Sequence, residues 1–205
     1  MVALVVILGM GLVFVARDTR DPLLAPRAGD DHWHAAYTIY NCGDEVAEYQ
    51  SVSDPDGIHS HQDGLIHIHP FNSSSSGEDA QLGVFLEAMS GTITQDSITG
   101  PDFADLNAAA GCNGEPAVIK VARYQVDPEL ELVAVYDRDF ETVQFLQDRE
   151  AFSIALVPAG EDPPPPGAGS LAQLDASTGS DLVSTGTVPL DTHSGTDTDT
   201  ESDDG

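Results

Sequence analysis

The chain has 205 residues, of which 35 are acidic and only 7 are Lys or Arg, so its formal net charge is -28 at pH 7. The length allows one ordinary domain with extensions. A surface this acidic repels nucleic acids and anionic lipid headgroups and attracts cations, which argues against DNA or RNA binding. The charge identifies no partner, because solubility or adaptation to salt explains the same composition.

The N-terminal segment is apolar from residue 2 to residue 16, which predicts a transmembrane anchor over residues 1–17. It is slightly shorter than the roughly 20 residues of a usual span, and it lacks the basic start of a signal peptide. A buried core helix is the alternative. We expect a single-pass protein of the cell membrane, with a polar connector over residues 18–30 and an extracytoplasmic main domain. The positive-inside rule argues for the opposite orientation through Arg17, Arg20 and Arg27.

Residues 31–40 alternate in the manner of a half-buried strand, and their aromatic and β-branched side chains also favour a strand. Successive side chains of a strand point to opposite faces. One face would carry His32, His34, Ala36, Thr38 and Tyr40, and the other Trp33, Ala35, Tyr37 and Ile39. Residues 45–57 are acidic and rich in turn formers, which predicts a loop or an irregular strand.

A histidine-rich hairpin is predicted over residues 57–70, where two His-x-His pairs flank an Asp-Gly turn signal. The length of its loop decides where the imidazoles point. A two-residue loop would turn the two pairs to opposite faces. A three-residue loop, Gln62-Asp63-Gly64, sets His59 opposite His67 and brings all four imidazoles to one face. We favour the longer loop, because Gly64 then takes the left-handed position that suits glycine.

The clearest helical pattern follows this hairpin. Its apolar side chains recur at helical spacing at Leu82, Phe85, Leu86 and Met89. Ser76 with Asp79 resembles a capping box, and Gly91 suits the position after the last helical residue. Residues 102–110 predict a further short helix.

Three more strands are predicted at residues 117–122, 130–136 and 152–157. The elements together predict an α+β domain over residues 31–160, mostly antiparallel sheet with one main helix. Four prolines at residues 163–166 favour an extended segment that ends the fold. Residues 161–205 are Pro-rich and then rich in Gly, Ser, Thr and Asp, which predicts a disordered acidic tail in which His193 is incidental.

Cys42 and Cys112 are the only cysteines of the chain. An even pair, far apart in a domain expected outside the cytoplasm, predicts one disulfide. Such a bond would contribute about 4 kcal/mol of stability by restricting the unfolded chain. Two buried thiols, or one thiolate bound to a metal, are the alternatives.

Six of the seven histidines form three His-x-His pairs, which are His32 with His34, His59 with His61, and His67 with His69. Imidazoles on adjacent strands are a frame for a divalent transition metal, with Zn or Cu favoured. Asp31 and Asp63 neighbour the pairs and are predicted to bind the metal or to accept an imidazole N–H. His69 is a weaker candidate ligand than the other five, because Pro70 follows it and can end the strand there. A metal-free titrating cluster and plain polar residues are the alternatives.

Three segments carry a resemblance to a bacterial family: residues 32–37, residues 57–70 with their Asp-Gly-x-Ile-His core, and residues 82–85. Together they are similar to a family of membrane-anchored exported proteins, found mainly in actinobacteria, with a His-containing domain. The similarity extends over about residues 30–166. It implies the architecture of an anchor followed by an exported domain, and it implies no particular reaction.

These features lead to one functional hypothesis with two alternatives. The hypothesis is a membrane-anchored extracytoplasmic domain that binds a divalent transition metal through its histidines. The first alternative is an enzyme that uses this metal to activate water or oxygen, with Asp63 as the nearby carboxylate. The second is a metal-free interaction module of the cell envelope. Bound metal beside an enclosed pocket would favour the enzyme, and metal with all positions filled by the protein would favour a structural site. Histidines scattered over two faces would favour the module.

Overall fold

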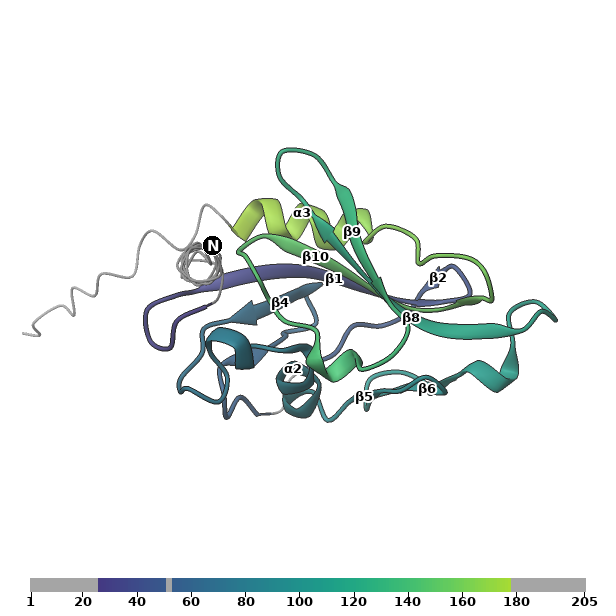
Figure 1. Cartoon of the computed structure of the whole chain (residues 1–205), viewed down its shortest axis with the longest axis horizontal. Coiled ribbons are helices and arrows are strands. Elements are labelled where there is room, and N and C mark those ends of the chain that lie inside the picture. Colours follow the sequence, from purple (N-terminus) through teal and green to yellow (C-terminus); the bar gives the residue numbers. More distant parts are fainter. Residues whose placement is uncertain (1–25, 51–52, 178–205) are drawn as a thin grey trace, which may run out of the picture.

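A mixed sheet of seven strands organises the part of the chain that the computed structural model describes, residues 26–50 and 53–177 (Figure 1). Across the sheet the order is β3 (Ile58–His59), β4 (Leu65–Ile68), β1 (Trp33–Asn41), β10 (Glu150–Pro158), β8 (Ala117–Gln125) and β9 (Glu131–Tyr136), while β2 (Asp44–Glu45) pairs with β1. β1 and β10 run parallel, and the other pairs are antiparallel. The predicted α+β class and the mostly antiparallel sheet are confirmed.

The alternation predicted for the first strand is also confirmed. Ala35, Tyr37 and Ile39 lie in the larger hydrophobic core, on one side of the sheet. Ala36 and Tyr40 pack into separate, smaller clusters. Since neighbouring residues of a strand face opposite ways, β1 has apolar partners on both sides of the sheet.

The larger core lies between the sheet and a second layer, seen below it in Figure 1. This layer holds α2 (Leu82–Ala88), a small antiparallel sheet of β5 (Thr92–Ile93), β6 (Ser97–Thr99) and β7 (Leu106–Asn107), and three short 3₁₀ helices, η1 (Gly77–Asp79), η2 (Ala108–Ala110) and η3 (Phe140–Thr142). The helical pattern at residues 82–89 is thus confirmed as core.

The predicted ends of that helix need correction. Ser76 precedes the 3₁₀ turn η1 and makes no side-chain cap, and α2 begins only after Gln81. At the other end Ser90, with φ 53°, takes the left-handed conformation. Gly91 is required for packing, because a Cβ there would lie 2.8 Å from the Tyr49 ring. The helix predicted at residues 102–110 is reduced to η2, which follows β7.

A second α-helix, α3 (Ala168–Ser177), covers the opposite face of the sheet (Figure 1). The prediction of a disordered tail from residue 161 is therefore wrong for residues 161–177. The Tyr124 hydroxyl donates to the Pro163 carbonyl (3.2 Å) and the Tyr40 hydroxyl to the Pro165 carbonyl (2.8 Å). Proline lacks an N–H but keeps its carbonyl, so this extended run can be held along the sheet by tyrosines. The remainder of the predicted tail, with His193, lies outside the described residues.

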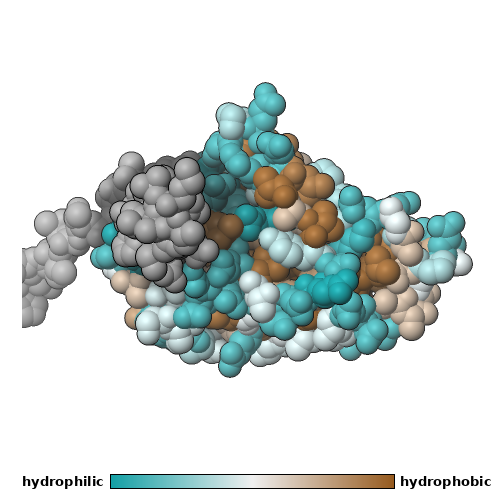
Figure 2. Space-filling model, viewed as in Figure 1, coloured by the Kyte–Doolittle hydropathy of each residue, from teal (hydrophilic) through white to brown (hydrophobic). Residues whose placement is uncertain are grey.

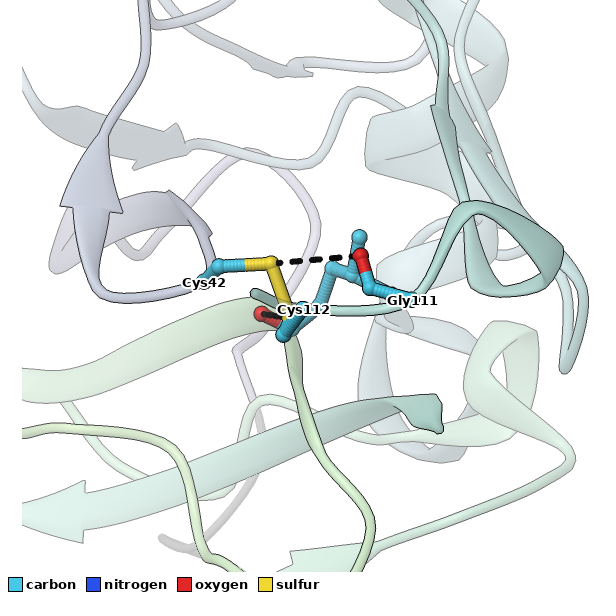
Figure 3. Close-up of a disulfide and its surroundings, with 4 residues drawn as sticks. Cys42, Gly111 and Cys112 are labelled. Atoms are coloured by element: carbon cyan, nitrogen blue, oxygen red, sulfur yellow. Dashed lines mark hydrogen bonds between the residues drawn. A yellow bond between two sulfur atoms is a disulfide. The ribbon is translucent and has the colours of Figure 1, made fainter. Parts of the chain in front are cut away.

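The predicted disulfide joins Cys42, just after β1, to Cys112, which follows η2 (Figure 3). The Cys42 sulfur lies 3.8 Å from the Gly111 carbonyl oxygen. A structural disulfide of this kind indicates a domain that folds outside the cytoplasm. It ties the main sheet to the second layer, at the end of β1 that lies away from His34.

The predicted anchor over residues 1–17 and most of the connector lie outside the described residues. Within residues 26–50 and 53–177, no helix has the length and apolar character needed to cross a bilayer.

The two edges of the sheet differ in chemistry. β9, at one edge, exposes Leu132, Val133 and Val135. Figure 2 shows apolar side chains exposed over this strand. β3, at the other edge, carries His59. The apolar edge and the histidine edge are thus separated by the full width of the sheet.

Candidate metal centre

Strands β3, β4 and β1 bring the histidines together on one face. His67 of β4 lies opposite His59 of β3 and opposite His34 of β1. The three imidazoles therefore form a row across three adjacent strands, since residues in register point to the same side. This register is the predicted one, and Gly64 has the expected positive φ of 75°. The connection is longer than the predicted three residues, because β3 ends at His59, β4 begins at Leu65, and His61 bridges to Gln50.

Ring contacts connect all six described histidines. The centroids of His32 and His34 are 4.9 Å apart, and those of His34 and His67 are also 4.9 Å apart. Further ring pairs lie between 4.6 and 5.4 Å apart: His59–His61, His61–His67, His59–His69, His32–His69 and His59–His67. The sequence-predicted metal residues thus form one continuous cluster, which we call the histidine face.

Gly57 makes room for the outer part of this face. Its carbonyl accepts the His69 backbone N–H at 2.8 Å, so His69 continues the β4 pairing although Pro70 follows. A Cβ on Gly57 would lie 2.3 Å from the His69 carbonyl oxygen, and the Gly57 φ of 81° is left-handed. Only glycine fits there without strain.

Asp54 is a member of the site that sequence reasoning missed. One of its carboxylate oxygens, Oδ1, accepts the Gly57 N–H at 2.7 Å, which holds the turn before β3. The other, Oδ2, lies 3.0 Å from His59 Nδ1 and 3.9 Å from His69 Nε2. The signal that could have found it is the turn sequence Asp-Pro-Asp-Gly at residues 54–57, directly before the histidine strand.

The contact between Asp54 and His59 has no hydrogen-bond geometry. His59 is only 6% exposed, and its Nδ1 is buried without a hydrogen-bond partner among the described residues. Its Nε2 lies 3.0 Å from Nε2 of His61, a distance that suits an N–H on one ring and a lone pair on the other. When His59 Nε2 carries the proton and donates to His61, its Nδ1 presents a lone pair toward the Asp54 carboxylate.

Of the two carboxylates predicted for the site, one is found there. Asp63 Oδ2 lies 2.9 Å from His67 Nε2 and accepts its N–H, as predicted, while Asp63 Oδ1 accepts the Leu65 N–H. Asp31 is held elsewhere by the Arg27 side chain, with an Nη2 to Oδ1 distance of 2.9 Å. Asp148, which was not predicted, accepts the His34 backbone N–H at 2.9 Å.

Burial changes the proton affinities of the face. Burial lowers the pKa of His59 to about 4. The Asp54 charge acts to raise this pKa, and the neighbouring histidines act to lower it further. Burial also lowers the pKa of His69. For Asp63 burial acts to raise the pKa, but the hydrogen bond and charge of His67 outweigh it and the pKa is lowered. At neutral pH His59 and His69 are therefore neutral, which is the form that binds metals.

The donor atoms gather into two groups of three. One group is His32, His34 and His67, and the other is Asp54, His59 and His69. Within each group the ligand atoms all lie within 4.8 Å of one another. His61 belongs to neither group, but it contacts His59. A metal bound to imidazole nitrogen at about 2.0–2.1 Å would need modest side-chain adjustment to gather either set.

A cavity of about 380 Å³ opens beside the two groups. It is lined by Gly29, Asp30, Asp31, His32, His69, Pro70 and Phe71. One histidine from each group, His32 and His69, therefore faces a space that water or a small molecule can enter.

Comparison of the chain with protein-family models, with curated proteins and with solved structures gives no match. The resemblance to exported actinobacterial proteins stays a prediction.

Proposed function

We propose that the domain binds a divalent transition metal ion through the histidine face, with Asp54, His59 and His69 as the first ligands. The observation that carries the proposal is the 3.0 Å approach of His59 Nδ1 to Asp54 Oδ2 without a hydrogen bond, at a buried position. In the tautomer in which His59 Nε2 donates to His61, an imidazole lone pair faces a carboxylate, which is repulsive, and burial of Nδ1 without a hydrogen-bond partner is costly. A cation between the two atoms would remove both costs.

The arrangement of the other histidines supports a metal over a simple polar surface. All six described histidines lie in one ring-contact network. Without a shared ligand this crowding has a cost, since the neighbouring imidazoles disfavour protonation of His59 and His69. The clustering on one face therefore argues against the metal-free interaction module.

The donor set favours particular ions. Imidazole suits Zn, Cu, Fe and Ni, and two imidazoles with one carboxylate bind Zn or Fe(II) in many proteins. Both cysteines are in the disulfide, so the domain offers no thiolate that would select Cu(I). We expect Zn²⁺ or Cu²⁺, in a role of metal handling or of metal support for the fold, in a domain attached to the cell membrane.

The test is the metal content of the full, untagged chain purified without chelator, measured by mass spectrometry. We expect at least one equivalent of a transition metal, and a clear loss in His59→Gln and in Asp54→Asn. His193→Gln, which changes the seventh histidine, is the matched control and should keep the wild-type content.

Circular dichroism of each variant separates loss of metal from loss of fold. Wild-type protein that holds no metal, and whose melting temperature does not rise on adding Zn²⁺ or Cu²⁺, would contradict the proposal.

A further inference from the structure

We infer that the histidine face binds two metal ions at once, the second held by His32, His34 and His67. This inference rests on the proposed function, which requires only the ion at Asp54, His59 and His69. The two ligand groups share no residue, and each brings three donor atoms within 4.8 Å of one another. Filling one group therefore removes no ligand from the other.

The two groups are direct neighbours across the strands. His59 of one group stacks on His67 of the other with centroids 5.4 Å apart and an interplanar angle of 15°. His32 and His69, again one from each group, are 5.1 Å apart. The two ions would lie side by side across strands β3, β4 and β1, with the imidazole rings of His59 and His67 between them.

The second group has its own orienting hydrogen bond. Asp63 accepts the N–H from Nε2 of His67, which leaves Nδ1 of the neutral ring as a lone-pair donor. A carboxylate that holds a histidine by one nitrogen is the usual support for a metal ligand on the other nitrogen. Asp148 fixes the backbone of His34 in the same group. The group is thus supported by carboxylates that the first group does not use.

Charge also allows two dications in one place. Asp54 belongs to the first group, and Asp63 contacts the second, so each ion has a carboxylate near its ligands. The chain as a whole carries a formal charge of -28, which lowers the cost of gathering positive charge.

The two groups differ in burial and in charge, so they should fill in order. The first group contains a carboxylate and the buried His59, whereas the second offers three imidazoles and no carboxylate, and its His32 is exposed. A direct carboxylate ligand attracts a dication more strongly than imidazole alone. We expect the first ion to bind more tightly and the second to exchange more readily through the cavity beside His32.

The experiment counts Zn²⁺ on the full, untagged chain after metal removal, by native mass spectrometry during a Zn²⁺ titration. The wild type and His193→Gln should take up two equivalents in two steps. His32→Gln should take up one, with the tight step kept. His69→Gln should take up one, with the tight step lost, and both substituted side chains are exposed or half-buried, so the fold should survive.

A second measurement replaces Zn²⁺ by Cu²⁺ and records the electron paramagnetic resonance spectrum at two equivalents. Two neighbouring Cu²⁺ ions should give a magnetically coupled spectrum in the wild type, and isolated ions should give an uncoupled one in His32→Gln. A single equivalent in the wild type, or two retained in His32→Gln, would overturn the inference while leaving the proposed function in place. No bound ion at all would overturn both.

Discussion

One face of the sheet is divided into two regions that use the same strands in opposite ways. Where α3 covers it, Ala36 of β1 and Leu65 of β4 pack against Leu174 and are almost fully buried. Two residues away along each strand, the same face carries His34 and His67. On both strands, the side chains of this face thus change from apolar to histidine between two successive positions of the same face.

The difference separates a region that stabilises the fold from the region for which we propose metal binding. In the covered region the stabilising free energy comes from apolar burial, as in any core. In the histidine region polar imidazole atoms are buried, which costs free energy, and His59 Nδ1 remains without a hydrogen bond. The first region should therefore respond to substitution by unfolding, and the second by loss of metal.

The largest effect on this comparison is expected from Leu174→Ala. Leu174 is fully buried against Ala36 and Leu65, and removing a buried leucine side chain costs about 2–5 kcal/mol. Urea unfolding followed by circular dichroism should show a lower midpoint with little change in slope. The metal content of the folded variant should equal that of the wild type.

An exposed residue of the same helix, Ala172→Gly, serves as the control for helix propensity alone and should cost no more than about 1 kcal/mol. If Leu174→Ala cost as little as this control, α3 would not stabilise the sheet and the division of the face would fail.

Much of this division could be predicted from the sequence, where local patterns decide the structure. The alternation of β1 follows from its two kinds of side chain, and the register of His59 with His67 follows from the Asp-Gly turn and the need for a left-handed Gly64. The pairing of the two cysteines followed from their number and the expected compartment.

The parts that could not be predicted depend on distant contacts. α3 is a short helix of small residues after four prolines, and only Ser170 and Leu174 of it are buried, so its sequence resembles a linker. The Asp54 carboxylate lies close to His59 because of the conformation of the loop before β3, which the sequence does not specify. The separation into two ligand groups depends on side-chain orientation, which no spacing rule provides.

A smaller effect, in the histidine region, is expected from pH. The pKa of His59 is lowered by burial from 6.5 to about 4 in the folded protein, so between these values the unfolded chain binds a proton that the folded protein does not. Its contribution to stability is therefore complete above pH 6.5 and is lost as the pH falls toward 4. In metal-free protein, the melting temperature of the wild type should fall more steeply over this range than that of His59→Gln.

Comparison with His59→Gln removes the effect of carboxylates, which also titrate in acid. His193→Gln should follow the wild-type curve. Parallel curves for the wild type and His59→Gln would mean that His59 takes up its proton in the folded protein as easily as in the unfolded one, and the buried lone pair at Nδ1 would lose its support.

The smallest effect is expected from Asp31→Asn, and it sharpens the boundary of the histidine region. Asp31 was predicted to serve the metal site, but its carboxylate binds the Arg27 side chain. Exposed pairs of this kind contribute little to stability. We expect no measurable change in the number of Zn²⁺ ions bound or in the unfolding midpoint.

Asp63→Asn, the matched change at the other predicted carboxylate, should weaken Zn²⁺ binding about 10–100-fold, because the hydrogen bond that orients His67 is weakened. Equal effects of the two substitutions on Zn²⁺ titrations would mean that Asp31 leaves Arg27 when metal binds, and the site would then extend to the start of β1.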